Sequence, residues 1–164
     1  MTLVIETGQD NQILRRKSEP IKTIDKKILR LLKEMEKSMK EEKGVGLAAP
    51  QVGRNVRMIL VLLNNKNLIP MINPEIIDHS DKTEVGEEGC LSLPGIWGNV
   101  ERYHEITVKY LDEKGTDRIL KLEGFNARVV QHEIDHLNGI LFTDYLDAED
   151  SLLNVMNQRE TERL

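Results

Sequence analysis

Two histidines, His132 and His136, stand one helical turn apart, and Glu133 lies beside the first. Residues four apart share one face of a helix, so both imidazoles can bind the same divalent ion. Glu133 would then face the open position of that ion and serve as a general base. The pattern His-Glu-x-x-His also arises by chance, so the prediction of a metal site depends on a third ligand.

A third ligand is expected because a catalytic metal site usually combines three protein ligands with a water molecule. Cys90, the one cysteine of the chain, follows two carboxylates in a turn-rich stretch and can complete the set. A lone cysteine is, however, more often a small buried hydrophobe. A downstream carboxylate, Asp144, Glu149 or Glu160, is the alternative and would indicate a metalloprotease. One protease pattern, His-Glu-x-x-His-x-x-Gly-x-x-His, has its third histidine six residues after the second. This chain has Phe142 there, so it does not match that pattern.

The segment 44–51, Gly-Val-Gly-Leu-Ala-Ala-Pro-Gln, has small residues that let a backbone approach a ligand or another strand. It lacks the pattern of a phosphate-binding loop, and no strand precedes it as a dinucleotide site requires. We interpret it as a turn leading into a sheet. Gln51 at its end is either a surface amide or a donor aimed at developing charge. His79 and His104 lie outside any ligand spacing.

Helices and strands must position these residues. Apolar residues recur at helical spacing between residues 24 and 42, opposite a Lys- and Glu-rich face, which predicts an amphipathic helix. A second helix carries the histidines, with Gly124 before its start and Asn138-Gly139 as its stop. Strands are predicted at residues 56–64, 69–73, 75–78, 83–87, 106–111 and 118–122, the last two joined by a hairpin.

These elements predict an α+β fold, with antiparallel sheets packed around a central metal-binding helix and an N-terminal amphipathic helix. The strands come in blocks between two helices, so a doubly wound parallel sheet is not expected. A chain of 164 residues with 39% hydrophobic and 31% charged residues can build one core, and we expect a single domain over residues 1–164.

The overall charge of −5 argues against a protein that binds nucleic acid by neutralising phosphates, although a local basic patch stays open. The start resembles no secretory signal, and the longest apolar run, residues 58–63, is too short for a membrane span. A single cysteine suits a reducing compartment. We therefore expect a cytoplasmic protein, or one in an organellar stroma or matrix if a transit peptide has been removed.

Three segments, 44–51, 88–92 and 131–136, resemble in order the three motifs of the peptide deformylase family. The resemblance covers residues 13–145 and implies an enzyme that removes the formyl group from the initiator methionine of new polypeptides. It implies one divalent ion, Fe²⁺ in vivo with Zn²⁺, Ni²⁺ or Co²⁺ as substitutes. The residue roles that it implies are metal ligation by Cys90, His132 and His136, acid–base catalysis by Glu133, oxyanion binding by Gln51 and the Leu91 N–H, and peptide alignment by the Gly46 backbone.

Further residues are assigned from their places beside these motifs. Val45, Phe125 and Val129 are expected to line a pocket for the methionine side chain. Ligand histidines usually donate their second N–H to a carboxylate or carbonyl, so Glu88 is expected to orient one of them. Arg102 is expected to pair with Glu88 or Asp135, while Arg128 receives no role.

Two features depart from the resemblance. Trp97 stands where some family members have arginine. Residues 147–164 carry five acids against two arginines, whereas bacterial members often end in a basic helix associated with the ribosome. The expected partners are N-formylmethionyl nascent peptides, with a transient ribosome contact left open and no membrane contact. A metalloprotease, a module with a structural zinc, and a metal-free domain are the alternatives.

Overall fold

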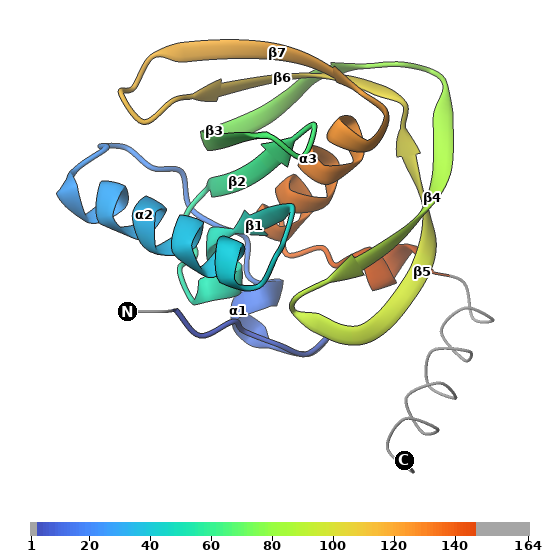
Figure 1. Ribbon diagram of the computed structural model, residues 1–164, viewed down its shortest axis with the longest axis horizontal. Coiled ribbons are helices and arrows are strands. Elements are labelled where there is room, and N and C mark those ends of the chain that lie inside the picture. The colour runs from blue at the N-terminus through green and yellow to red at the C-terminus, as the bar shows by residue number, and fades with distance from the viewer. Residues whose placement is uncertain (1–2, 147–164) are drawn as a thin grey trace.

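The computed structural model describes residues 3–146 (Figure 1). Its strands form a five-stranded antiparallel sheet, in the order β1-β2-β3-β6-β7, and a two-stranded β4–β5 sheet. Their bounds are β1 Gly46–Ala48, β2 Met58–Leu63, β3 Asn67–His79, β4 Thr83–Cys90, β5 Leu93–Tyr103, β6 Glu105–Leu111 and β7 Asp117–Glu123. The helices are α1 Gln12–Arg15, α2 Lys26–Glu41 and α3 Gly124–Leu137, with 3-10 turns at Ala49–Val52 and Phe142–Tyr145. The predicted α+β fold with antiparallel sheets is confirmed.

Helix α3 lies in the interior. Figure 1 shows it between the large sheet and the β4–β5 hairpin, and it contacts strands of both sheets. Ala127, Val130 and Leu137 on α3 are fully buried against one face of the large sheet. The helix ends at Leu137, Asn138 is its C-cap residue, and Gly139 follows with a φ of 73°. The predicted central helix is therefore present, and its stop lies where the sequence indicates.

Helix α2 covers the opposite face of the large sheet. Side chains of a strand alternate between faces, so Ile59 and Val61 of β2 pack toward α3, while Met58 and Leu60 join the cluster that contains α2. Asp25 caps α2 by accepting a hydrogen bond from the Ile28 N–H. Its buried side chains are Leu31, Leu32, Met35, Ser38 and Met39. Among the helices of residues 3–146, none has the length and apolar character needed to cross a membrane.

The β4–β5 hairpin corrects one prediction. Residues 87–95 were expected to be a turn-rich loop, and no strand was predicted between that loop and residue 106. Instead β4 continues to Cys90, and β5 begins at Leu93 after a two-residue turn. Few side chains of this hairpin are buried, and Pro94, Gly95 and Gly98 are poor strand formers, so periodicity did not reveal β5.

Two further segments differ from the sequence prediction. The stretches 69–73 and 75–78 form one strand, β3, whose pairing with β6 is interrupted near Asn73. Asn73 has a φ of 51°, and its side chain accepts from the Ile21 N–H and donates to the Ile21 carbonyl, both at 2.8 Å. The segment 44–51 is not only a turn, because it contributes β1 and most of the 3-10 turn that follows.

Gly139 is expected to be more sensitive to substitution than other glycines with positive φ. A methyl group at Gly139 would overlap the Arg15 backbone, whereas one at Gly115, whose φ is 80°, would meet only the end of Ile24 at 3.7 Å. Gly115→Ala should therefore cost only the left-handed strain, about 1 kcal/mol. Gly139→Ala should cost about 2–4 kcal/mol, because overpacking adds to that strain. Urea unfolding of both variants tests the difference, and equal losses would contradict the steric argument.

Candidate functional site

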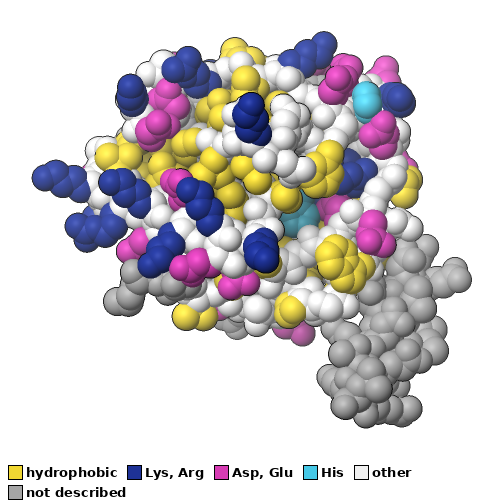
Figure 2. All heavy atoms as spheres, viewed as in Figure 1, with side chains coloured by type: hydrophobic (Ala, Val, Ile, Leu, Met, Phe, Trp, Pro, Cys, Tyr) yellow, Lys and Arg dark blue, Asp and Glu magenta, His cyan; other side chains and the backbone are white. Residues whose placement is uncertain are grey.

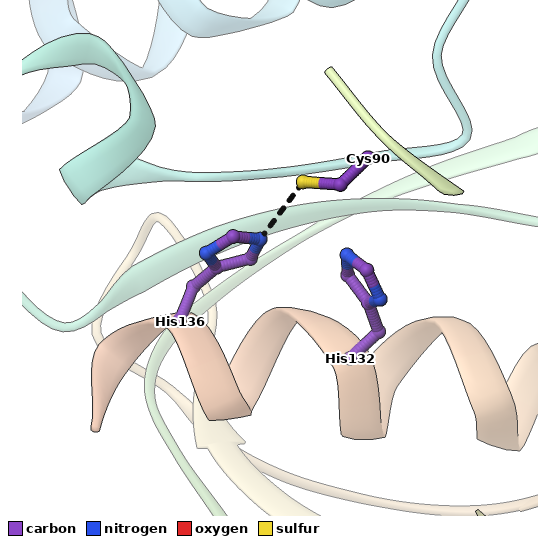
Figure 3. A group of neighbouring side chains, drawn as sticks. All are labelled: Cys90, His132 and His136. Carbon is purple, nitrogen blue, oxygen red and sulfur yellow. Dashed lines mark hydrogen bonds between the residues drawn. The ribbon is translucent and has the colours of Figure 1, made fainter. Parts of the chain in front are cut away.

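The three predicted ligands converge between α3 and the end of β4. Cys90 Sγ lies 3.3 Å from His136 Nε2, and one ligand atom from each of Cys90, His132 and His136 lies within 4.8 Å of the others (Figure 3). Figure 3 shows both imidazoles rising from the same face of α3 toward the cysteine above them. A thiolate and two imidazoles are ligands that zinc and neighbouring transition metals accept.

Local structure explains how Cys90 reaches the helix. Its strand pairing shifts between Glu88 and Cys90, so the ladder of β4 and β5 is irregular where the cysteine lies. Such irregularities re-aim side chains next to functional sites. Arg128, His132 and His136 follow one another at intervals of four and therefore share a face of α3.

Glu88 lies at the centre of the contacts around the ligands. Its Oε1 lies 2.8 Å from His132 Nδ1, which leaves Nε2 of that histidine for the metal. Arg102 donates to both carboxylate oxygens, each at 2.9 Å. Burial alone would raise the pKa of Glu88, but the hydrogen bonds from Arg102 and His132 lower it to about 2. The carboxylate is therefore charged across the neutral range.

Arg128 makes a second buried ion pair with Glu88 that the sequence did not reveal. Its Nη1 donates to Glu88 Oε2 at 2.7 Å and to the Val100 carbonyl at 2.8 Å. Its Nη2 donates to the Glu84 carbonyl at 2.8 Å. Gly86 leaves room for the guanidinium, since a methyl group there would overlap it. The spacing of Arg128 to His132 was the one sequence signal of this role.

Asp135 is joined to the same network through Arg102. Arg102 Nη1 donates to Asp135 Oδ2 at 2.6 Å, and the Tyr145 hydroxyl donates to the same oxygen at 2.8 Å. The Arg102 guanidinium also lies 4.9 Å from the centre of the Tyr145 ring. Arg102 thus contacts both of its predicted partners and links β4 to α3.

Glu133 is buried beside the ligands. Its Oε1 has no hydrogen-bond partner among the described residues, and burial raises its pKa to about 7 against the opposing charge of His132. Its other carboxylate oxygen lies against Gly46, where any side chain would overlap it. A carboxylate in this state can accept and release a proton near neutral pH.

Gln51 is buried, so its side chain is not a surface amide. Its Oε1 accepts from the Ala48 N–H at 2.9 Å, which turns the amide nitrogen toward the site. That nitrogen donates to Ser92 Oγ at 3.0 Å and to Cys90 Sγ at 3.4 Å. Ser92 is a contact that the sequence did not single out, although it lies in the same motif as the cysteine.

A cavity of about 510 Å³ opens beside these residues. Its walls include Gln51, Cys90, Leu91, His132 and Glu133, and the four residues predicted to contact substrate, Val45, Gly46, Phe125 and Val129. Trp97 and Arg128 line it as well. Val129 is buried, whereas Phe125 and Trp97 are each 58% exposed. Figure 2 shows apolar side chains gathered on this face around a histidine. The predicted residues are therefore brought together around one cavity.

The electrostatics of the bare protein favour a cation at the three ligands. Burial would lower the pKa of His132, but contacts with Cys90 and Glu88 and the charge of Glu133 raise it to about 10. The pKa of His136 falls well below its ordinary value because of burial and the charge of His132. A divalent ion would displace the His132 proton, as is usual when imidazoles become ligands. The residues present therefore fit one metal ion, with fewer than four protein ligands.

The alternative ligands predicted for a protease are not assembled here. Asp144 lies in an ion pair with Arg15 at 2.7 Å, and Cys90 completes the histidine group among residues 3–146. Glu149 and Glu160 lie outside the described residues. His104, to which the sequence assigned no ligand spacing, lies within 4.8 Å of Glu105 and Glu123 in a second, more exposed group. His79 stacks on Tyr103, with ring centres 3.8 Å apart.

Removing the carboxylate that holds His132 should weaken metal binding. We expect Glu88→Ala to lower metal affinity by about 10–100-fold, because the ligand loses its orienting partner. Glu87→Ala removes the same charge from an exposed neighbour and is the matched control. Competition with a chelator measures the affinity of each variant. Equal affinities for Glu88→Ala and the wild type would show that the contact does not orient the ligand.

The lowered pKa of Glu88 also predicts how stability depends on pH. A carboxylate whose pKa falls from 4.5 to about 2 on folding stabilises the native state above pH 4.5, and this contribution is lost as the pH falls toward 2. The contribution is about 3 kcal/mol at neutral pH. The stability difference between the wild type and Glu88→Gln should therefore shrink below pH 4.5. Unfolding in urea with a chelator present measures it, and a difference that stays constant to pH 2 would refute the assignment.

Comparison with known proteins agrees with this geometry. A family model described as polypeptide deformylase matches residues 3–151. A peptide deformylase of Natranaerobius thermophilus is 46% identical over 135 residues, which cover 82% of this chain and 86% of that protein. A crystal structure of a peptide deformylase from Legionella pneumophila matches with a TM-score of 0.91 and 34% identity over 99% of this chain and 96% of that one.

A Met-Ala-Ser bound crystal structure of a class I type b peptide deformylase from Acinetobacter baumannii is also similar. Its TM-score is 0.84 at 37% identity, and the match covers 89% of this chain and 99% of that one. The family model spans the whole described region, and the identity to the Natranaerobius protein holds over most of both chains. On these grounds, the chain belongs to the polypeptide deformylase family.

Proposed function

We propose that this protein is a metal-dependent hydrolase that removes the N-formyl group from the initiator methionine of new polypeptides. Water cleaves the formyl amide bond, and the products are formate and a free N-terminus. The observation that carries this proposal is the meeting of Cys90, His132 and His136 with the buried Glu133 at one cavity. Membership of the deformylase family supports the same reaction.

Cys90, His132 and His136 would hold the metal ion. When bound, the ion would lower the pKa of a water molecule and polarise the formyl carbonyl. Three protein ligands leave a position open, which favours a catalytic ion over a structural zinc with four protein ligands. We propose Fe²⁺ as the native ion, because the resemblance to the deformylase family implies it. Thiolate and imidazole ligands also accept Zn²⁺, Ni²⁺ and Co²⁺, so these ions could replace it.

Glu133 would carry the proton. It accepts a proton from the water that attacks the formyl carbon and returns it to the nitrogen of the leaving amine. Its burial supports this role, because a pKa raised to about 7 suits both transfers at neutral pH. Gly46 supports it too, since the missing side chain lets the carboxylate lie against the β1 backbone.

Gln51 and the backbone N–H of Leu91 would stabilise the negative oxygen of the tetrahedral intermediate. The Gln51 amide is held by Ala48 and Ser92, so its nitrogen is oriented before substrate arrives. Donors oriented in advance stabilise developing charge without reorganisation. Leu91 follows Cys90 directly and lines the cavity, which supports a second donor at this point.

The cavity would bind the methionine side chain and the start of the peptide. Val45, Phe125 and Val129 supply apolar walls, and the Gly46 backbone at the start of β1 would align the peptide. The related Acinetobacter structure, which is bound to Met-Ala-Ser, supports a methionine-led peptide as ligand. A formyl carbon carries only hydrogen, so tight packing beside the ligands would exclude larger acyl groups.

Three further expectations concern the cellular compartment, the extent of the catalytic domain and a contact with the ribosome. We propose the cytoplasm, because one unpaired cysteine among the ligands suits a reducing compartment. We also propose that residues 1–164 form one catalytic domain. A transient ribosome contact would follow from a nascent substrate, and the acidic tail at residues 147–164 lies outside the described residues.

A formate assay tests the reaction and the division of roles. The metal-loaded wild type should release formate from formyl-Met-Ala and should leave an unformylated peptide intact. Glu133→Gln should keep near-normal metal content and lose most turnover, because only the proton acceptor is removed. Cys90→Ala should lose both. Elemental analysis measures the metal, and cleavage of the unformylated peptide with no formate release would favour a metalloprotease.

The iron assignment predicts sensitivity to oxygen. A thiolate that shares a site with Fe²⁺ is exposed to oxidation, so the iron form should lose activity in air while the nickel and zinc forms persist. Half-lives of each form under air and under nitrogen measure this. Equal half-lives for the iron and nickel forms in air would count against iron as the native ion.

A further inference from the structure

One face of α2 carries a row of cations that the proposed reaction does not use. Lys26, Arg30, Lys33, Lys37 and Lys40 follow one another at alternating steps of four and three, and all five are exposed. This spacing places them on one side of the helix, and we call them the basic stripe. At a rise of 1.5 Å per residue the stripe is about 21 Å long. Figure 2 shows Lys and Arg side chains over this part of the surface.

The basic stripe is not neutralised within the described chain. Among residues 3–146, Lys40 is its one member with a carboxylate oxygen within 4.0 Å, that of Glu36 at 2.9 Å. Helix α2 as a whole has six cations against three carboxylates, whereas the full chain has a net charge of −5. Positive charge is thus concentrated on one helix of an acidic protein, and such segregation indicates a polyanionic partner.

The position of α2 narrows the choice of partner. Its apolar side chains Leu31, Met35 and Met39 are buried in the core, so the helix has no free apolar face to insert into a membrane. The helix ends at Glu41, and the next residues, Glu42, Lys43 and Gly44, form part of the cavity wall. A partner on the basic stripe would therefore lie next to the cavity that receives the peptide.

We propose that the basic stripe binds the phosphate backbone of an RNA double helix. A straight row of exposed cations suits a regular row of phosphates, and such contacts position a protein without reading sequence. This inference rests on the proposed function, because a nascent formylated peptide emerges from the ribosome, whose surface is rich in RNA helices. The basic stripe would hold the cavity near the emerging N-terminus.

Binding of metal-loaded protein to a fluorescent 20-base-pair RNA duplex tests this proposal. Anisotropy between 50 and 200 mM KCl should show an affinity that falls steeply with salt, with a slope of log K against log salt near about −4 for five contacts. Lys33→Gln/Lys37→Gln should weaken binding by roughly ten-fold and reduce the slope by about 2. Glutamine is a good helix former, so these two substitutions at exposed positions should leave α2 folded. Lys33→Arg/Lys37→Arg should keep the wild-type affinity.

The matched control is Lys82→Gln/Lys121→Gln, which removes the same charge from exposed positions outside α2. It should bind RNA like the wild type. If it lost as much RNA affinity as Lys33→Gln/Lys37→Gln, net charge alone would explain the effect and the basic stripe would have no special role. Poly-glutamate and phosphatidylglycerol vesicles replace RNA in two further assays. If poly-glutamate binds as tightly as RNA, or if the vesicles bind and RNA does not, the assignment to RNA is wrong.

Formate release from free formyl-Met-Ala separates this proposal from the proposed function. The Lys33→Gln/Lys37→Gln variant should hydrolyse the free peptide like the wild type, since neither lysine lines the cavity. It should pellet less with ribosomes than the control variant does. Normal hydrolysis with equal pelleting of both variants would overturn the role of the basic stripe alone, whereas no hydrolysis by the wild type would overturn the proposed function alone.

Discussion

The site depends on one buried carboxylate, that of Glu88. Its two oxygens contact Arg102, Arg128 and His132 within 2.9 Å, and these partners come from β5 and α3. A buried charge is tolerated only when it is paired and hydrogen-bonded, so these segments must meet in one arrangement. The contact between Glu88 and His132 Nδ1 also leaves Nε2 of that histidine to face the metal site. Fold stability and ligand orientation therefore share one interaction.

Small residues provide the space in which these charged groups meet. Gly46 lets the Glu133 carboxylate lie against β1, and Gly86 lets the Arg128 guanidinium cross β4. Any larger side chain would displace the group that it faces. The consequence for Glu133 is chemical as well as steric, because burial raises its pKa. The backbone at these two positions is thus part of the site.

Local pattern predicted the elements whose burial is periodic. Helices α2 and α3 and strands β2, β6 and β7 lie near the predicted ranges, because each has an apolar face or a buried run. Strand β5 was missed, since its alternating residues are largely exposed and glycine and proline obscure the pattern. Strand β3 was divided, because the irregularity at Asn73 interrupts the period of two. Pairing with β4 forms β5, and pairing with β2 and β6 makes β3 one strand, and an apolar pattern along the chain does not reveal these partners.

The sequence by itself determined the ligand types, the spacing of His132 to His136, and the family, because residue identity and helical periodicity are local properties. It also indicated Glu88, Arg102 and Asp135 as orienting residues, without deciding which contacts they make. Only the tertiary structure decided that Arg128 is a buried partner of Glu88, and that Ser92 holds Gln51. These contacts join residues about 40 positions apart, and their distance in space depends on how the β4–β5 hairpin lies against α3 and against the 3-10 turn that carries Gln51.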